Sequence, residues 1–163
     1  MKSFTQFNEA FDSSYKFNGK KVSNDEYSYG FDSKTENAEG KINTTRIQVD
    51  IVGSENADDD DYYIWNIGFS RRGNGSKASY DVTGEGDALK IFSTVMKIAQ
   101  DFVKKEDPKY ISFAAEKPSG APRMVMATRE KLYLRMANKF FGSKFKILVK
   151  STTTGSVFYL DRK

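Results

Sequence analysis

The residues best placed for chemistry on a phosphate are Gly84, Gly86 and Ala88, which stand between a predicted strand and a predicted helix. Small residues at such a turn let the backbone come close to a ligand, and the unpaired N–H groups of a helix N-terminus attract anions. Glu85 and Asp87 carry negative charge on the same loop, and Asp87 also suits the N-cap of the helix. The spacing therefore leaves two interpretations open, a phosphate-binding loop and an ordinary strand-to-helix turn.

The chain contains no histidine and no cysteine. These absences exclude a Ser-His-Asp hydrolase, a histidine-ligated zinc enzyme and a cysteine nucleophile. The acidic run at residues 58–61 lacks the alternating ligands and the glycine of a calcium loop, so we expect it to lie in solvent. No metal site is predicted.

An apolar stripe opens the chain, because Phe4, Phe7 and Phe11 recur at intervals of three and four residues. This spacing predicts a short amphipathic helix over residues 1–12. Chain termini are usually frayed, so aromatic residues at this place indicate a contact. The stripe either docks on a partner or packs on the protein's own domain, and both interpretations stay open.

Positive charge is concentrated in the second half of the chain. Residues 1–81 hold 10 Lys and Arg against 14 Asp and Glu, whereas residues 82–163 hold 16 against 8. Such a basic surface can contact nucleic-acid phosphates, and solvated helix faces are the alternative. Seven basic residues form the candidate patch, namely Arg129, Lys131, Arg135, Lys139, Lys144, Lys146 and Lys150.

Hydrophobic periodicity predicts one α+β domain over residues 25–163, behind a polar tether at residues 13–24. The order of elements predicts a mixed, mostly antiparallel sheet with two main helices packed on it. Gly142 is expected to end the second helix in the left-handed conformation. Strands are expected at residues 26–31, 45–52, 62–69, 78–82, 110–115, 145–149 and 157–160, and helices at residues 88–105 and from 123 or 128 to 141.

This order and the glycine loop together resemble the Gcn5-related N-acetyltransferase fold, over about residues 45–160. In that family a strand leads to an acyl-CoA pyrophosphate loop that opens a helix. A further strand, a helix with a Leu-Tyr pair and two closing strands follow. Gly86-x-Ala88 matches the end of the loop motif, and Leu132-Tyr133 matches the Leu-Tyr pair. The resemblance implies acetyl-CoA as cofactor, bound at the loop, and Tyr133 as general acid toward the departing thiolate.

The first ten residues resemble the capsid-targeting peptide of T-even-type phage internal head proteins. That peptide begins Met-Lys-(Thr/Ser)-aromatic, and the prohead protease of those phages cuts after the glutamate of a bulky apolar, any residue, Glu pattern. Met1-Lys2-Ser3-Phe4 and Phe7-Asn8-Glu9-Ala10 match the two parts. The resemblance implies docking on a capsid or scaffold protein and cleavage between Glu9 and Ala10.

These observations favour a phage virion or head-associated protein that acts by binding, not by catalysis and without a cofactor. An acyl-CoA-dependent N-acetyltransferase is the first alternative. A phage accessory protein that binds nucleic acid or a host factor through the basic half is the second. We expect the protein in the phage head or the host cytoplasm, neither secreted nor in a membrane, because no secretory signal and no membrane-spanning apolar run is found.

Overall fold

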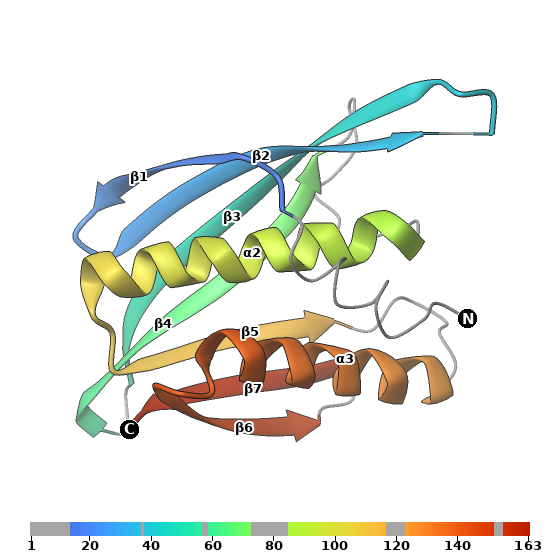
Figure 1. Cartoon of the computed structure of the whole chain (residues 1–163). Coiled ribbons are helices and arrows are strands. Elements are labelled where there is room, and N and C mark those ends of the chain that lie inside the picture. Colours follow the sequence, from blue (N-terminus) through green and yellow to red (C-terminus); the bar gives the residue numbers. More distant parts are fainter. Residues whose placement is uncertain (1–13, 37, 57–58, 73–84, 117–122, 152–154) are drawn as a thin grey trace.

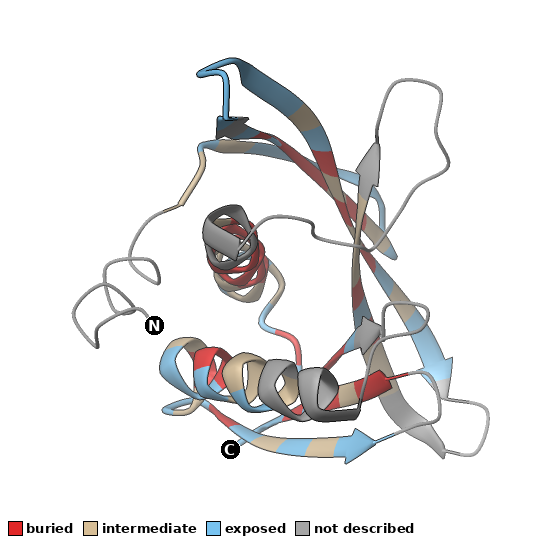
Figure 2. Ribbon diagram, turned by 90° about the vertical axis from the view of Figure 1, so that its right-hand side faces the viewer, coloured by how far each residue is buried: buried red, intermediate tan, exposed pale blue. Residues whose placement is uncertain are grey.

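The structure is a computed structural model that describes residues 14–36, 38–56, 59–72, 85–116, 123–151 and 155–163. In these residues, seven strands form one sheet in the order β1-β2-β3-β4-β5-β7-β6 (Figure 1). The helices α2 and α3 cover one face of that sheet (Figure 2). The predicted α+β class, with a mixed and mostly antiparallel sheet and two helices, is confirmed. The elements are β1 (Phe17–Ser23), β2 (Glu26–Glu36), β3 (Ile42–Asn56), β4 (Asp59–Arg72), α2 (Glu85–Glu106), β5 (Tyr110–Glu116), α3 (Arg123–Phe141), β6 (Phe145–Ser151) and β7 (Gly155–Arg162).

All neighbouring strands pair antiparallel except β4 and β5, which pair parallel. A parallel pair needs a long crossover connection, and α2 supplies it between β4 and β5. The second helix, α3, connects β5 to β6, and β7 then returns between these two strands. Both helices lie on the same face, and no helix of the described residues covers the opposite face of the sheet (Figure 2).

The core lies between the sheet and the two helices. The rings of Tyr27, Trp65 and Phe102 meet edge to face, with centroids 4.9 to 5.9 Å apart. Along α2, Met96 is fully buried and Phe92 is 3% exposed. Burial of each such side chain stabilises the fold by roughly 1.5–3 kcal/mol, so α2 is held in place mainly by apolar contact.

Residues 17–23 form strand β1, where the sequence predicted part of a polar tether. β1 pairs with β2 from Phe17↔Phe31 to Ser23↔Glu26. Phe17 is partly buried and the other side chains of β1 are exposed, so no apolar alternation marks the strand in the sequence. Backbone hydrogen bonds to β2 hold it, and these bonds leave no trace in a hydropathy pattern.

Gly142 follows the last residue of α3, as expected, but its predicted left-handed conformation is wrong. Among the described glycines, positive φ angles occur at Gly40 and Gly155. The N–H of Gly142 donates to the carbonyl oxygen of Asn138 at 2.8 Å, and a Cβ at position 142 would lie 2.5 Å from that oxygen. Glycine fits here because the last turn of α3 places this carbonyl oxygen where a Cβ at position 142 would stand.

Candidate functional site

Strands β4 and β5 separate near the middle of the sheet. They pair over only four residues, and the last pair is Ile67 with Phe113. β4 nevertheless continues to Arg72 and β5 to Glu116, and the two strands diverge toward their carboxyl ends (Figure 1). Each keeps its other partner, because β3 pairs with β4 and β7 pairs with β5 to these last residues. We call this opening in the ladder the β4–β5 wedge. Open α/β sheets bind ligands at the carboxyl ends of parallel strands.

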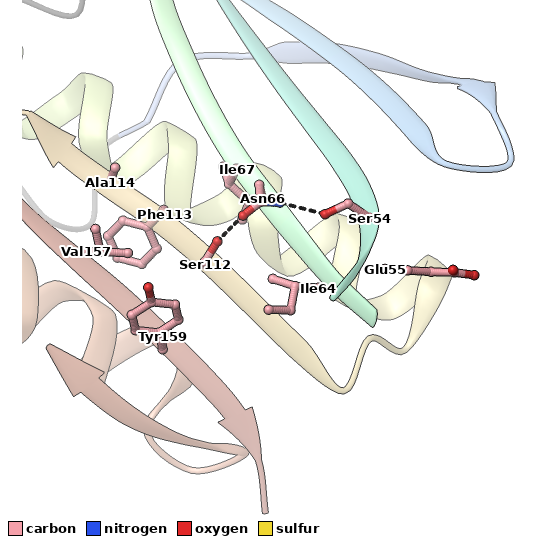
Figure 3. A pocket seen from close by; sticks show the side chains of 10 residues that line it. All are labelled: Ser54, Glu55, Ile64, Asn66, Ile67, Ser112, Phe113, Ala114, Val157 and Tyr159. Carbon is pink, nitrogen blue, oxygen red and sulfur yellow. Dashed lines mark hydrogen bonds between the residues drawn. The ribbon is translucent and has the colours of Figure 1, made fainter. Parts of the chain in front are cut away.

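A hollow of about 460 Å³ lies across β3, β4, β5 and β7 (Figure 3). Within it, the hydroxyl of Ser112 donates a hydrogen bond to Asn66 Oδ1, and Asn66 Nδ2 lies 3.5 Å from the hydroxyl oxygen of Ser54. Tyr159 lines the same hollow and is 38% exposed. Gly68 follows the last β4–β5 pair. Apart from its two chain neighbours, no described residue has an atom within 4 Å of the position that a Cβ of residue 68 would take. Open space therefore adjoins the wedge.

An aromatic cluster lies at the base of the wedge on the helix-covered face. Phe92 of α2 lies near Phe69 of β4 and Phe113 of β5, with ring centroids 6.4 and 6.1 Å away. The ring of Tyr133, on α3, stacks on Phe92 with centroids 4.2 Å apart and planes 17° apart. Tyr133 therefore lies near the point where β4 and β5 separate, and the ring of Phe92 connects it to Phe113 of β5.

The predicted glycine loop lies only partly within the described residues. Gly86 and Ala88 lie inside the first part of α2, which begins at Glu85, and Gly84 lies outside the described residues. Asp87 is also inside the helix, so its prediction as the N-cap is wrong. The helix therefore begins earlier than expected, despite the low helix propensity of Gly86. Because α2 follows β4, its N-terminus faces the carboxyl-end side of the wedge (Figure 1).

Comparison with known proteins matches most of the chain to a protein family. The matching family is described as "Family of unknown function (DUF6934)", and it covers residues 12–156. The chain belongs to this family. No curated protein and no solved structure matches the chain. The DUF6934 region contains the wedge, the aromatic cluster and both helices, so these features belong to the shared part of the sequence.

The N-terminal peptide precedes the DUF6934 region, which begins at residue 12. The expected helix over residues 1–12, its Phe4, Phe7 and Phe11 stripe, and the predicted cleavage between Glu9 and Ala10 lie outside the described residues. The expected strand at residues 78–82 lies outside them as well.

The predicted basic patch is divided between two faces of the DUF6934 domain. One group lies on α3, and another lies on β6, where side chains alternate between the two faces of the sheet. Phe145 of β6 is buried in the core, so the exposed Lys146 and Lys150 point to the face opposite α3. The members on α3 are Arg129, Lys131, Arg135 and Lys139, and Lys144 lies in the turn between the two elements.

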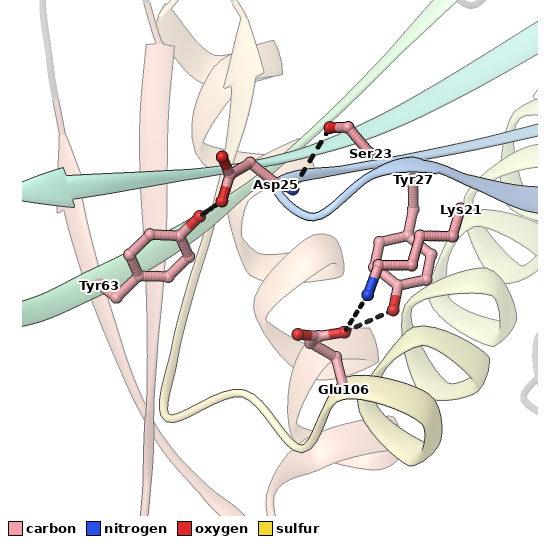
Figure 4. A network of polar contacts seen from close by, with 6 residues as sticks. All are labelled: Lys21, Ser23, Asp25, Tyr27, Tyr63 and Glu106. Atoms are coloured by element: carbon pink, nitrogen blue, oxygen red, sulfur yellow. Dashed lines mark hydrogen bonds and ion pairs between the residues drawn. The ribbon is translucent and has the colours of Figure 1, made fainter.

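A tyrosine–carboxylate network surrounds the C-terminus of α2, and the sequence did not reveal it (Figure 4). The hydroxyl of Tyr27 donates to the carboxylate of Glu106, and Lys21 Nζ lies 4.0 Å from the same oxygen. The hydroxyl of Tyr63 donates to the carboxylate of Asp25. Tyr27 and Glu106 are 79 positions apart in the chain, so no local spacing could have indicated their contact.

These hydrogen bonds keep the tyrosines protonated. Burial and the hydrogen bond to Glu106 raise the pKa of Tyr27 to about 12. The hydrogen bond to Asp25, followed by burial, raises the pKa of Tyr63 to about 12. Each hydroxyl is therefore a donor to a carboxylate at neutral pH. The Tyr27–Glu106 bond joins the end of α2 to β2, and the Tyr63–Asp25 bond joins β4 to the turn between β1 and β2.

No helix in the described part of the chain is long and apolar enough to cross a membrane. The described residues also contain no group of three or more His, Cys, Asp or Glu side chains that could hold a metal ion.

Proposed function

We propose that this DUF6934 domain binds an acyl-CoA-type ligand in the β4–β5 wedge, and that it acts by binding rather than by acyl transfer. The observation that carries this proposal is the end of the ladder at Ile67 and Phe113 while both strands continue. An acetyltransferase-like arrangement is part of the proposal. It is supported by the parallel β4–β5 pair, the helix that connects its strands, and the helix and two antiparallel strands that follow.

The wedge presents two strand edges to a ligand. Beyond Ile67 and Phe113, the facing edges of β4 and β5 pair with no strand among the described residues. Their N–H and C=O groups can hydrogen-bond to an extended molecule that carries amides, as they would to an added strand. The pantetheine arm of coenzyme A is an extended chain with amide groups, and its chemistry fits this edge.

The N-terminus of α2 is suited to the pyrophosphate of the same ligand. Unpaired N–H groups in the first turn of a helix attract anions, and this turn contains the small residues Gly86 and Ala88. Glu85 and Asp87 lie in the same turn and oppose this attraction. We therefore expect most of the affinity to come from the pantetheine arm in the wedge.

The aromatic cluster is suited to the acyl end of the ligand. Phe69 and Tyr133 are partly exposed and each lies near the ring of Phe92, so together they offer an apolar surface. The chain has no histidine, the side chain that most often serves as a general base. Binding without transfer is therefore the proposed activity, and transfer with Tyr133 as the acid is the alternative that the experiment distinguishes.

Titration calorimetry of the full chain with acetyl-CoA tests the site. Gly68→Val adds a side chain where open space lies beside the wedge, so the variant should fold normally and exclude the ligand. We expect saturable binding by the wild type and affinity at least about tenfold lower in Gly68→Val, a loss of roughly 1.4 kcal/mol. Ser28→Val places the same side chain on β2, two strands from β4, and should keep wild-type affinity.

Failure of the wild type to bind, or equal binding by Gly68→Val, would contradict the proposal. Acetyl-pantetheine, which lacks the nucleotide, should show most of the difference in affinity between the wild type and Gly68→Val that acetyl-CoA shows. Release of free coenzyme A in the presence of amines, abolished by Tyr133→Phe, would assign acyl transfer instead.

A second proposed function is delivery into a phage head through residues 1–10. It is favoured by the start of the DUF6934 match at residue 12, which leaves the peptide outside the region shared by the family. A targeting peptide added to a family domain is expected to lie outside the region that the family shares. In this proposal the Phe4, Phe7 and Phe11 stripe docks on a capsid or scaffold protein, and a protease cuts after Glu9.

Mass spectrometry of purified virions tests delivery. We expect either a chain that begins at Ala10 or an intact chain, and a Phe4→Ser, Phe7→Ser double variant should be expressed but missing from heads. A wild-type chain that is present in infected cells and missing from virions would reject this function.

A further inference from the structure

A second hollow, of about 480 Å³, lies beside the chain that leads into β1 and is bordered by β2, β3 and α2. Its described lining includes four cationic side chains and one carboxylate, namely Lys16, Lys34, Arg46, Lys90 and Asp32. Most of these cations belong to the half of the sequence in which acids outnumber bases, 14 to 10. Their gathering around one hollow is therefore a local feature and does not follow from average composition.

The cations around this hollow are only partly neutralised. Arg46 Nη1 lies 3.3 Å from Asp32 Oδ1, and Lys90 Nζ lies 4.2 Å from the centre of the Tyr15 ring. Within the described part of the chain, no ion pair involves Lys16 or Lys34. Like charges around one hollow repel each other, and an anion between them would remove that repulsion.

Tyr15 holds the walls of the hollow together. Its backbone N–H donates to Thr94 Oγ1 of α2 at 2.9 Å. Its hydroxyl lies 3.2 Å from both the backbone nitrogen and the carbonyl oxygen of Lys34 on β2. Its ring stacks on Phe31, with centroids 5.8 Å apart. Because one side chain joins α2, β2 and the entry to β1, the lysines on these elements are held around a common space before any ligand binds.

Arg46 lies across Gly30, which also lines the hollow. A Cβ at Gly30 would lie 2.5 Å from a nitrogen of the guanidinium. The glycine therefore leaves room for the guanidinium to lie along β2. A guanidinium can form two parallel hydrogen bonds to a phosphate, which an ammonium cannot.

We propose that this hollow binds a small ligand that carries two or more phosphate groups. Its volume falls within the range of small-molecule sites, and its charge exceeds what one phosphate monoester would balance. The site shares no described lining residue with the hollow at the β4–β5 wedge. It is therefore independent of acyl-CoA binding.

Titration calorimetry of the full chain with inorganic tripolyphosphate, at roughly 50 mM salt to limit screening, tests the site. We expect saturable binding by the wild type. A Lys16→Gln, Lys34→Gln double variant should bind at least about tenfold more weakly, because it removes two charges at the hollow. The matched control is Lys104→Gln, Lys144→Gln, which removes two exposed lysines outside the hollow and should keep affinity within about twofold.

Absence of saturable binding by the wild type, or an equal loss in both double variants, overturns the proposal. All four substituted lysines are exposed, and melting curves check that the variants fold. Adenosine triphosphate separates two sources of the phosphate groups. Tighter binding than tripolyphosphate assigns a nucleotide, and equal binding assigns the phosphate chain itself. Gly68→Val should leave tripolyphosphate binding unchanged, so failure of this site and failure of the wedge are distinguishable.

Discussion

Ile67 of β4 and Phe113 of β5 form the last backbone pair between these strands, and beyond them the ladder opens although both strands continue. Ile67 and Phe113 are each 6% exposed, so the opening starts from a well-packed base. The aromatic ring of Phe92 lies next to this base on the helix-covered face. Core packing and the candidate ligand site therefore meet at the same residues.

Phe92→Ala should be among the more damaging single substitutions in the chain. The side chain is 3% exposed and its ring contacts Phe69, Phe113 and Tyr133. Removing a buried ring of this kind costs about 3–5 kcal/mol, a large share of the stability of a typical domain. Phe92→Leu keeps most of the volume and should cost about 1–2 kcal/mol. Urea denaturation measures both, and a cost below about 1 kcal/mol for Phe92→Ala would show that the cluster does not support the fold.

Tyr133 should contribute to acetyl-CoA binding and to stability through its aromatic ring. Tyr133→Phe keeps the stack on Phe92 and should change acetyl-CoA affinity by no more than about fivefold, since a single neutral hydrogen bond has a net value of about 1 kcal/mol or less. Tyr133→Ala removes the stack and should lose both stability and affinity. If Tyr133→Phe lost affinity as fully as Tyr133→Ala, the hydroxyl would be the contacting group and the role of the ring would be rejected.

Much of the fold could be predicted from the sequence, because periodicity reports which side chains face the core. The alternation at residues 45–52 marks β3, with Ile47, Val49 and Ile51 buried, and apolar spacing marks α2 and α3. β1 escaped prediction because its stability comes from backbone pairing at a sheet edge. The place of β7 between β5 and β6 also escaped, since strand order depends on contacts between distant residues.

The candidate site was predictable only in part. Gly84, Gly86 and Tyr133 stood out because of their local spacing, and the structure places Tyr133 near the wedge. Gly68 carries no such signal, because what matters is the empty space around it. The cations around the second hollow come from four separate segments, so the sequence suggested a basic patch only where lysines and arginines are close in the chain.

The tyrosine–carboxylate network predicts a loss of stability at high pH. The pKa values of Tyr27 and Tyr63 are raised from 10.0 to about 12 in the folded chain. Below pH 10, both tyrosines are protonated in the folded and the unfolded states. Between pH 10 and 12 the unfolded state loses these protons first, so the free energy of unfolding should fall as pH rises through this range. Denaturation midpoints measured from pH 9 to pH 12 check this, and Tyr27→Phe should make the fall less steep. An identical pH dependence in Tyr27→Phe would rule out this tyrosine as a source.

Asp107, which follows α2, predicts different effects for two small replacements. It has a φ angle of 48°, a left-handed conformation, and its carboxylate lies 2.5 Å from Arg162 Nη1. Asp107→Ala loses an exposed ion pair and keeps the left-handed backbone, so it should cost up to about 1 kcal/mol. Asp107→Gly loses the same ion pair but removes the strain, so its stability should stay within about 0.5 kcal/mol of the wild type. Thermal denaturation separates them, and equal destabilisation would mean that backbone strain at this position is negligible.

Hydrogen–deuterium exchange with and without acetyl-CoA tests the β4–β5 wedge most directly, because it reports on the backbone groups that the ligand would engage. If the ligand adds between the strand edges, amides at residues 68–70 of β4 and 114–116 of β5 should become protected, and Gly68→Val should abolish that protection. The edge strands β1 and β6 should exchange as before. Unchanged exchange at residues 68–70 and 114–116 with saturating acetyl-CoA, or protection confined to other strands, would contradict a ligand site between β4 and β5.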